Sequence, residues 1–406
     1  MKILVTGIGL VAPNGFGLEA FWQATLAGHS GLGVLTRFDV DGYPALVVGQ
    51  IDGFAPERHL PSRLLAQTDV STQLALVASD WALQDAKIEP ATFTDYEMGT
   101  VTSNACGGFA FTHREFHKLW SQGPETVSVY ESFAWFYAVN SGQISIRNTL
   151  RGPGMALVAE QAGGLDAIGH ARRTIRLGTP LVVTGGVDSA LDPWGWLSQC
   201  AGGRISTASN PAQAYLPFDT AACGYVPGEG GAILVLEDER AARARDAQQV
   251  YGEIAGYACT FDPPPGSRRP PGLRRVIELA LADAGVPPHG VDVVFADAAG
   301  LAELDRIEAE AIAGVFGARG VPVTAPKTLT GRLYSGGGPV DVAAALLSIR
   351  DGVIPPTAGT TDVPQEYQLD LVFGGPRQAA VSTALVLARG RWGFNAAVLV
   401  RGTSDR

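Results

Sequence analysis

Short runs of apolar and β-branched residues recur along the whole chain, separated by turns that contain glycine or proline. Runs of this length and composition are typical of buried β-strands. We therefore expect strands at residues 2–12, 98–105, 155–161, 180–188, 230–238, 250–258, 291–300 and 321–327, and two strands joined by a turn within residues 383–402.

Between these runs, apolar residues recur at the spacing of one face of an α-helix. The pattern predicts helices at residues 71–86, 165–178, 273–285, 302–317 and 340–352. Because strands and helices alternate, we expect an α/β fold. Several of these helices carry small apolar residues on nearly all sides, which predicts that they are buried between layers.

The series of strands and helices restarts after a charged segment at residues 234–249. This segment is rich in Ala and Arg, and it is expected to be an exposed connector. The order of elements predicts two halves, residues 1–245 and residues 246–406. No repeat can be read directly from the residues, so this prediction rests on element order alone.

The composition excludes several classes of function. The chain has 406 residues, of which 46% are hydrophobic, and its 30 basic and 40 acidic residues give a net charge of −10. Nucleic-acid binding needs a concentrated basic face, so no nucleic-acid partner is expected. No apolar run reaches the roughly 18 residues of a membrane helix. The first residues do not resemble a signal peptide, and we therefore expect a cytoplasmic protein without a membrane partner.

The sequence also argues against a bound metal or cofactor. The four cysteines have neither Cys-x-x-Cys spacing nor a disulfide-rich pattern, which fits a reducing compartment. His113 and His117 are four residues apart, but no metal-binding motif surrounds them. The glycine turn near the N-terminus lacks the dinucleotide-binding fingerprint. We expect neither a metal nor a cofactor.

One stretch, MALVAEQAGGLDAIGHARRTIRLG at residues 155–178, predicts a short strand, a tight turn at Gln161 and a helix. This geometry holds a nucleophile in many enzymes, but the amide of Gln161 is not a nucleophile. The N–H groups at the start of the helix could hold a carbonyl oxygen or a carboxylate. From these residues alone, Gln161 belongs either to such a site or to an ordinary helix start.

Motifs along the whole chain resemble those of the β-ketoacyl synthases, which have the thiolase fold. Their first strand is similar to ILVTGIGLVAPNG, and their active-site segment is similar to VAEQAGGLDAIGHARR. Their GEG block resembles PFDTAACGYVPGEGGAILVLED, and their Lys–Gly-His block resembles PKTLTGRLYSGGG. Their gating loop resembles GRWGFNAAVLV. The resemblance implies a thiolase fold, with two similar halves in a five-layered α-β-α-β-α arrangement.

The positions that carry the chemistry of these synthases are changed. The resemblance places Gln161 where they have the nucleophilic cysteine, and Asp297 and Arg332 where they have two histidines, whereas Lys327 and Glu229 are retained. An amide cannot form an acyl thioester, and Asp297 would repel the anion that forms on decarboxylation. We expect a chain that does not catalyse condensation and in which Asp297 and Arg332 pair with each other.

This set of changes is similar to that of the chain length factor, or ketosynthase beta subunit, of type II aromatic polyketide synthases. The resemblance implies a heterodimer with an active ketosynthase (alpha) subunit, whose cysteine extends a chain delivered by acyl carrier protein. In that family the inactive subunit limits chain length by closing a tunnel at the interface.

By the same resemblance, the tunnel is lined by Phe109, Thr112, Phe116 and Trp194. The first three are spaced to share one helix face, and spacing alone also fits a stripe of core residues. A bulky side chain stops the growing chain, and two phenylalanines flanking a threonine resemble the octaketide type of gate. The aromatic segment at residues 129–148 is expected at the interface, with Phe133 or a neighbour reaching the partner.

Two other functions stay open at this stage. The first is a malonyl decarboxylase that primes the synthase through Gln161, since loading synthases have glutamine at the same place. Those loading synthases keep both histidines, whereas the resemblance places Asp297 and Arg332 at the two histidine positions of this chain. This difference favours a structural role for Gln161. The second is a homodimeric, degenerate thiolase that acts only as a binding module.

Overall fold

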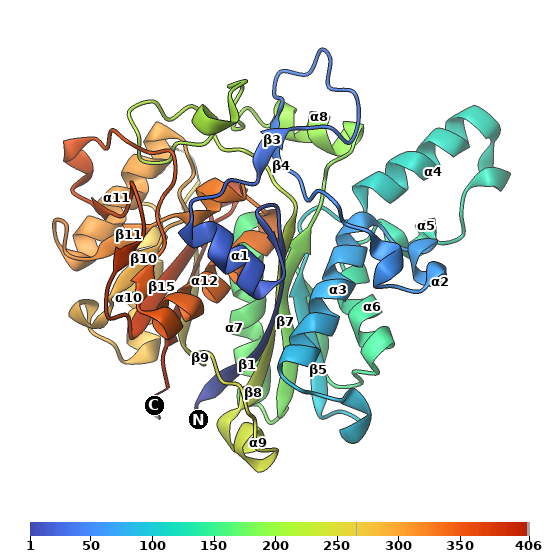
Figure 1. Ribbon diagram of the computed structural model, residues 1–406, viewed down its shortest axis with the longest axis horizontal. Coiled ribbons are helices and arrows are strands. Elements are labelled where there is room, and N and C mark those ends of the chain that lie inside the picture. Colours follow the sequence, from blue (N-terminus) through green and yellow to red (C-terminus); the bar gives the residue numbers. More distant parts are fainter. Residues whose placement is uncertain (265, 404–406) are drawn as a thin grey trace.

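A single mixed sheet runs through the molecule (Figure 1), which is described by a computed structural model covering residues 1–264 and 266–403. Along its main path the strands follow the order β13-β11-β10-β15-β16-β9-β1-β8-β7-β5-β6. The short strand β2 (Gly15–Phe16) pairs with β1. Two separate two-stranded sheets are also present. One contains β3 (Leu32–Val34) and β4 (Val47–Gly49), and the other contains β12 (Val353–Ile354) and β14 (Arg377–Gln378).

The sheet contains the same strand pattern twice. In the N-terminal half, β1 (Ile3–Ala12), β8 (Gly230–Asp238), β7 (Leu181–Asp188), β5 (Met98–Ser103) and β6 (Gly154–Leu157) lie side by side. The C-terminal half repeats this order with β9 (Gly252–Phe261), β16 (Phe394–Arg401), β15 (Thr383–Arg389), β10 (Val293–Phe295) and β11 (Pro322–Thr324), and adds β13 (Asp370–Leu371). In each half the first two pairings are antiparallel and the next two are parallel.

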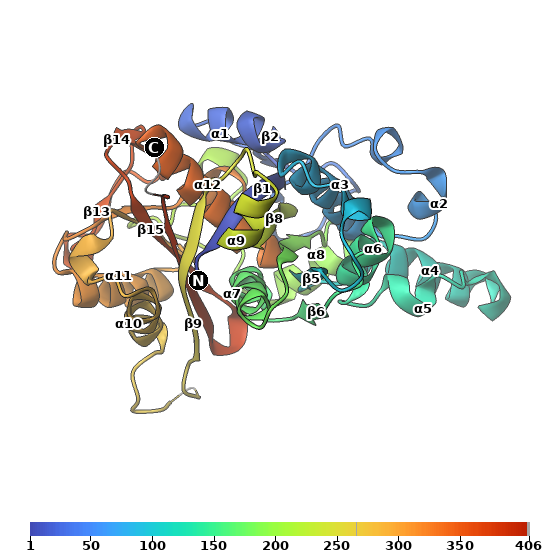
Figure 2. The same ribbon diagram turned by 90° about the horizontal axis from the view of Figure 1, so that it is seen from below.

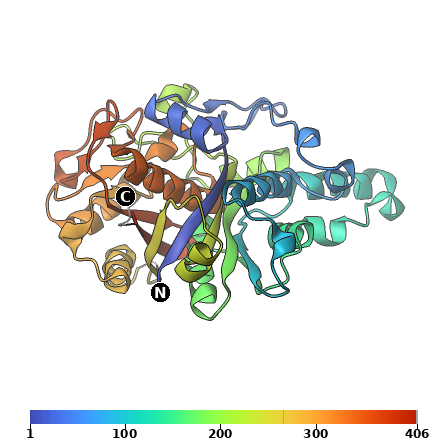
Figure 3. The same cartoon turned by 60° about the horizontal axis from the view of Figure 1, so that its bottom comes forward.

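Within the large sheet, a short pairing joins the two halves, in which Leu4 and Val5 of β1 lie opposite Glu253 and Gly252 of β9. Helices α7 (Gly163–Arg176) and α12 (Gly337–Asp351) contact strands of both halves, so they form a central layer. Helices α3 (Val70–Asp85) and α6 (Val139–Asn148) cover the N-terminal half, whereas α10 (Leu273–Ala284) and α11 (Ala302–Phe316) cover the C-terminal half (Figures 1 and 3). The result is the five-layered α-β-α-β-α thiolase fold that the sequence motifs implied.

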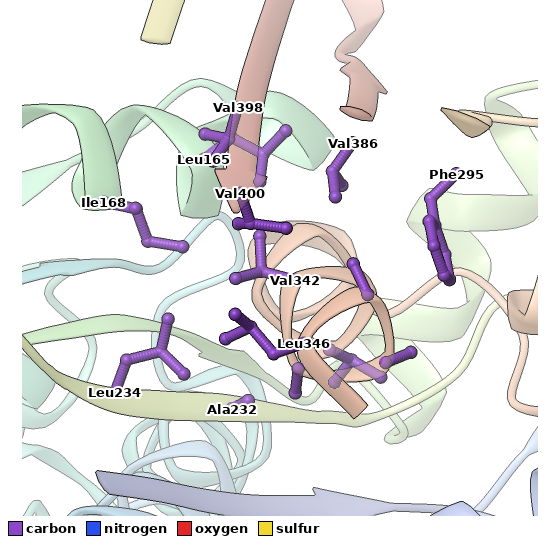
Figure 4. Packing of buried hydrophobic residues seen from close by; sticks show 14 of the residues in the cluster. Leu165, Ile168, Ala232, Leu234, Phe295, Val342, Leu346, Val386, Val398 and Val400 are labelled. Atoms are coloured by element: carbon purple, nitrogen blue, oxygen red, sulfur yellow. The ribbon is translucent and has the colours of Figure 1, made fainter. Parts of the chain in front are cut away.

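The main core surrounds the two central helices. Leu165 and Ile168 of α7 and Val342 and Leu346 of α12 lie among apolar residues from both halves of the sheet, with Phe295 at the edge of the group (Figure 4). Every residue of α12 from Gly338 to Ser348 is buried, so the helix is covered on all sides along most of its length. A helix that is apolar on all sides is stable only inside a protein, which explains the small apolar residues seen in the sequence.

The five helices predicted from the pattern are all present, with ends within three residues of those expected. The terminal strand pair is also confirmed, as β15 and β16. The prediction of an exposed connector at residues 234–249 is wrong in part, because β8 extends to Asp238 and α9 (Glu239–Ala244) follows it. The buried Glu237 of this segment accepts hydrogen bonds from the side chain of Arg245, which neutralises its charge. The boundary near residue 245 stays a prediction.

The remaining helices gave weaker signals because they are short or mainly polar. Besides α6 and α9, they are α1 (Leu18–Leu26), α2 (Ser62–Leu65), α4 (Phe109–Gln122), α5 (Glu131–Ala134) and α8 (Pro193–Ala201). Helices α4 and α5 project from the N-terminal half, away from the central layer (Figure 2).

Close packing of β1 against α3 gives a prediction on stability. A Cβ atom at Gly9 would lie 1.9 Å from the carbonyl oxygen of Ala78 in α3. Gly9→Ala is therefore expected to lower the free energy of unfolding by about 3 kcal/mol, measured by urea denaturation. Gly33→Ala is the matched control, because a Cβ there meets no atom within 4 Å. Equal effects of the two substitutions would contradict the packing argument.

Candidate functional site

Gln161 lies at the start of the central helix α7. Strand β6 ends at Leu157, a single 3₁₀ turn spans Glu160–Ala162, and α7 begins at Gly163. The two glycines of the motif allow close packing here, since a Cβ at Gly164 would lie 2.0 Å from the carbonyl oxygen of Ser335. The strand–turn–helix predicted at this point is confirmed, with the strand shorter than expected.

The side chain of Gln161 is only 5% exposed. Its Nε2 atom is buried and has no hydrogen-bond partner among the described residues. A buried N–H donor without a partner costs about 1–3 kcal/mol, so it is uncommon away from functional sites. The amide is thus a free donor at the position where the sequence resemblance predicts the nucleophile of the synthases.

Asp297 and Arg332 form a buried ion pair, as the sequence suggested. Nη2 of Arg332 donates to Oδ1 of Asp297 at 2.8 Å, and Nη1 donates to Oδ2 at 3.1 Å and to the Asp297 carbonyl oxygen at 2.7 Å. The backbone N–H of Arg389 donates to the same carboxylate at 2.8 Å. This bidentate geometry is the strong form of an Arg–carboxylate ion pair, because both carboxylate oxygens accept a hydrogen bond from the guanidinium.

The charges around Asp297 act in opposite directions. Burial disfavours its charged form, but the cations of Arg332, Lys327 and Arg389 together outweigh this and hold the pKa of Asp297 below its ordinary value. Its neighbour Glu308 has no such partner, and burial together with the Asp297 charge raises the pKa of Glu308 to about 7. Glu308 accepts hydrogen bonds from the backbone N–H groups of Asp297 and Ala298, which fixes this turn.

The two retained family residues have structural partners. Lys327 donates to the carbonyl oxygens of Ala296 and Asp297 and pairs with Asp341 at 2.7 Å. Glu229 is fully buried and accepts two hydrogen bonds from Arg37. It also accepts hydrogen bonds from Ser189 Oγ at 2.6 Å and Ile51 N at 2.9 Å. Both residues therefore hold backbone segments around the site in place.

A cavity of about 90 Å³ opens beside Gln161 and the ion pair. Its wall contains several guanidinium groups and one exposed ring, and it is formed by Glu160, Gln161, Arg204, Tyr225, Asp262, Asp297, Ala299, Leu301, Leu304, Arg332 and residues 389–393. Gln161, Asp297 and Arg332, identified separately from the sequence, thus share one small cavity. No group of three or more His, Cys, Asp or Glu side chains in the described ranges is placed to hold a metal ion.

The residues predicted to line a tunnel lie elsewhere, where α4 meets α8. The ring of Phe109 packs edge-on against Trp194 with centroids 5.2 Å apart, and Phe116 packs against the same indole at 5.9 Å. Thr112 is buried on α4 between them, at 7% exposure. The structure therefore gathers both phenylalanines around one tryptophan, while their role in a tunnel stays a prediction.

Sequence reasoning missed one polar contact in this cluster. His113 was considered only as a metal ligand, but its Nδ1 lies 2.6 Å from Oδ2 of Asp192, the residue that caps α8. Its position four residues after Phe109 was the available signal, because this spacing puts both side chains on the same helix face.

Phe133, proposed as an interface residue, is half-buried and packs against Tyr130 with ring centroids 6.0 Å apart. Its neighbours expose more apolar surface: Trp135 is 47% exposed and Phe136 is 46% exposed. If this segment meets a partner, these two rings offer the larger contact area.

The buried ion pair gives a second prediction on stability. Arg332→Met leaves the Asp297 carboxylate buried without its main partner, so the free energy of unfolding is expected to fall by about 3–5 kcal/mol. The double variant Arg332→Met/Asp297→Asn should recover part of this loss, because it removes the unpaired charge and keeps an acceptor for Arg389 N.

Arg306→Ala, in the exposed pair Arg306–Glu310, is the control and should cost less than about 1 kcal/mol. Denaturant unfolding measures all three variants. A loss in Arg332→Met no larger than that in the control would show that the pair does not matter for stability.

Comparison with known proteins agrees with these features. The family model for the N-terminal domain of beta-ketoacyl synthases matches residues 1–242, and the model for the C-terminal domain matches residues 251–361. No helix in residues 1–264 and 266–403 has the length and apolar character needed to cross a membrane.

Among curated relatives, the beta-ketoacyl synthase 2 of the actinorhodin polyketide system of Streptomyces coelicolor is 70% identical, covering 99% of this chain and 98% of its own. The tetracenomycin polyketide synthase ketoacyl synthase beta subunit of Streptomyces glaucescens is 58% identical, covering 98% of both chains. Among solved structures, the ishigamide ketosynthase/chain length factor is 26% identical with a TM-score of 0.89, covering 99% of both chains. The chain therefore belongs to the beta-ketoacyl synthase family.

Proposed function

We propose that this chain is a chain length factor, the non-condensing subunit that pairs with an active ketosynthase and sets the length of an aromatic polyketide. The observation that carries the proposal is the state of the family's active site. A glutamine amide stands in place of the nucleophile, and the buried Arg332–Asp297 pair stands in place of the two histidines.

This site cannot support the condensation reaction. Acyl transfer needs a nucleophile that forms a covalent thioester, which the amide of Gln161 cannot do. Decarboxylation creates an enolate, and its charge must be stabilised by a nearby donor. Arg332 is one of the cations of this cavity, but its guanidinium is already bound to Asp297, whose carboxylate would repel the enolate.

The surface of the N-terminal half supports a protein partner. Strand β6 lies at one end of the sheet and pairs only with β5 along the path of described strands. Its Met155 is 40% exposed, and the adjoining Val158 is 50% exposed. An apolar edge strand is a liability in an isolated protein unless a partner covers it. The named relatives fit this proposal, because one is a beta subunit and one solved structure is a ketosynthase/chain length factor.

The aromatic cluster of Phe109, Phe116 and Trp194 supports a mechanism in which large side chains limit the length of the polyketide. These rings are large and lie at the exposed junction of α4 and α8, where Phe116 and Trp194 are each 41% exposed. We propose that they close a tunnel completed by the ketosynthase, while acyl carrier protein delivers malonyl units in the cytoplasm. Their similarity to the octaketide type of gate favours an eight-unit product.

Product length in a reconstituted synthase tests the proposal. The chain is combined with an active ketosynthase, acyl carrier protein and malonyl transferase, and the products are analysed by mass spectrometry. Octaketides are expected from the wild type, and longer chains from Phe109→Ala and Phe116→Ala, since each removes a ring from the tunnel end. Trp120→Ala, on the same helix but 83% exposed, should leave product length unchanged.

If neither phenylalanine variant shifts product length, the cluster is ordinary packing and the gate lies elsewhere. If a stable homodimer forms and no polyketide appears with any ketosynthase, the chain is better described as a separate binding module.

A second function, decarboxylation of malonyl-acyl carrier protein, is favoured by one observation. The unpartnered Nε2 of Gln161 is a donor that could bind a thioester carbonyl and stabilise the developing enolate. The argument against it, from the resemblance, is the loss of the two histidines with which the synthases hold the thioester carbonyl.

The decarboxylation proposal predicts that Gln161→Ala abolishes acetyl-carrier formation by the reconstituted pair, followed by mass spectrometry of the carrier protein. Gln161→Glu is the matched control for size, and it should also be inactive because it places a negative charge beside the enolate. Unchanged acetyl formation in Gln161→Ala would assign Gln161 a structural role only.

A further inference from the structure

Helix α4 projects from the body of the protein, so a small number of contacts fixes its orientation (Figure 2). Its first turn is held by Asp69, the N-cap residue of α3, which accepts a hydrogen bond from the backbone N–H of Phe111 at 2.8 Å. A second anchor is α8, through the aromatic contacts of Trp194 and through His113, and the segment that follows α4 holds it too, since Ser128 N donates to Glu115.

His113 is the polar residue in the middle of the α4–α8 contact. It lies four residues after Phe109 and three before Phe116, so the three side chains share one face of the helix. Its Nδ1 lies 2.6 Å from Oδ2 of Asp192. The two rings that meet Trp194 therefore lie on either side of this hydrogen bond.

Asp192 links the bond directly to the position of Trp194. Its other oxygen, Oδ1, accepts from the backbone N–H of Gly195 at 2.6 Å and so caps the first turn of α8. Trp194 lies within that turn. Because Asp192 is only 5% exposed, its carboxylate is poorly solvated and a hydrogen bond to it is worth more than one at the surface.

We propose that His113 is a specificity-determining positioning residue, whose hydrogen bond to Asp192 holds α4 and α8 at the separation that closes the Phe109–Trp194–Phe116 cluster and so sets product length. This inference rests on the proposed function as a chain length factor. His113 does not touch the growing chain in this proposal; it acts through the turn that carries Trp194.

A purely structural role would have a different signature. The side chain of His113 is 41% exposed, and it borders a groove of about 490 Å³ whose wall includes Arg37, Arg114 and His117. Loss of the hydrogen bond leaves Oδ2 of the buried Asp192 without this donor, so it is expected to lower the stability of the fold as well. A purely structural role would lower stability without changing the ratio of products made per folded complex, whereas a positioning role also shifts that ratio.

The test uses the reconstituted heterodimer with carrier protein and malonyl transferase, and compares four variants. His113→Leu removes the hydrogen bond, whereas His113→Asn keeps a side-chain N–H close to the position of Nδ1. His117→Leu is the matched control, since it makes the same change one turn further along α4. Phe109→Ala reports independently whether the cluster sets length.

We expect His113→Leu to raise the ratio of longer to wild-type-length products about tenfold, which is the bias that one charge-assisted hydrogen bond provides. His113→Asn should restore the wild-type ratio at least in part, and His117→Leu should match the wild type. Total polyketide yield per folded complex should stay close to wild type in all three histidine variants, and the melting temperature of the complex should stay close to wild type in His113→Asn and His117→Leu.

Two outcomes would overturn the inference while leaving the proposed function intact. In both, Phe109→Ala lengthens the products. In the first, His113→Leu keeps the wild-type ratio; in the second, His113→Leu and His113→Asn shift it equally. If Phe109→Ala itself leaves product length unchanged, the proposed function of the cluster fails, and the role of His113 fails with it.

Discussion

The burial of two helices between the halves of the sheet is the constraint on which the rest of this structure depends. Helix α12 has almost no solvent-facing side, and α7 exposes only a narrow stripe that ends in Arg173 and Arg176, so their other residues must be small, apolar or fully paired. Arg172 of α7 illustrates the last case. It donates to the carbonyl oxygens of Ile254 and Ala255 in β9 and pairs with Asp283 of α10 at 2.6 Å. A single cation thus connects the central layer to the C-terminal half.

The same constraint fixes where the site lies. The two central helices begin close to each other, with Gly164 packed against the backbone of Ser335. Asp188, at the end of β7, accepts hydrogen bonds from Ser335 and from the backbone of Ala105. Burial raises the pKa of Asp188 to about 6, which shows how little solvent reaches this junction. Gln161 therefore occupies a rigid point where elements of both halves meet.

Within this rigid frame the chemistry has been exchanged while the backbone has been kept. The Asp297–Arg332 pair is well formed, but a buried ion pair contributes little net stability because desolvation offsets the attraction. We interpret it as a way to fill a polar cavity without leaving an uncompensated charge. A fold can host many functions, and here the family's frame supports the proposed measuring role better than a condensing one. In the proposed function, the residues that set product length lie on α4 and α8, outside the layered core.

The sequence by itself determined the layered fold and the changed site. Periodicity located the five long helices because each buries an apolar face or its whole surface, whereas resemblance to the motifs of a known family singled out Gln161, Asp297 and Arg332. Phe109, Phe116 and Trp194 came from resemblance, since helix spacing alone could not separate a gate from a core stripe. Only the tertiary structure placed His113 against Asp192, 79 residues away in the chain. It also decided that Nε2 of Gln161 has no partner and that Asp297 and Arg332 share a cavity with it. The reason is physical: periodicity records which face of an element is buried, whereas hydrogen bonds between distant side chains depend on how the elements pack.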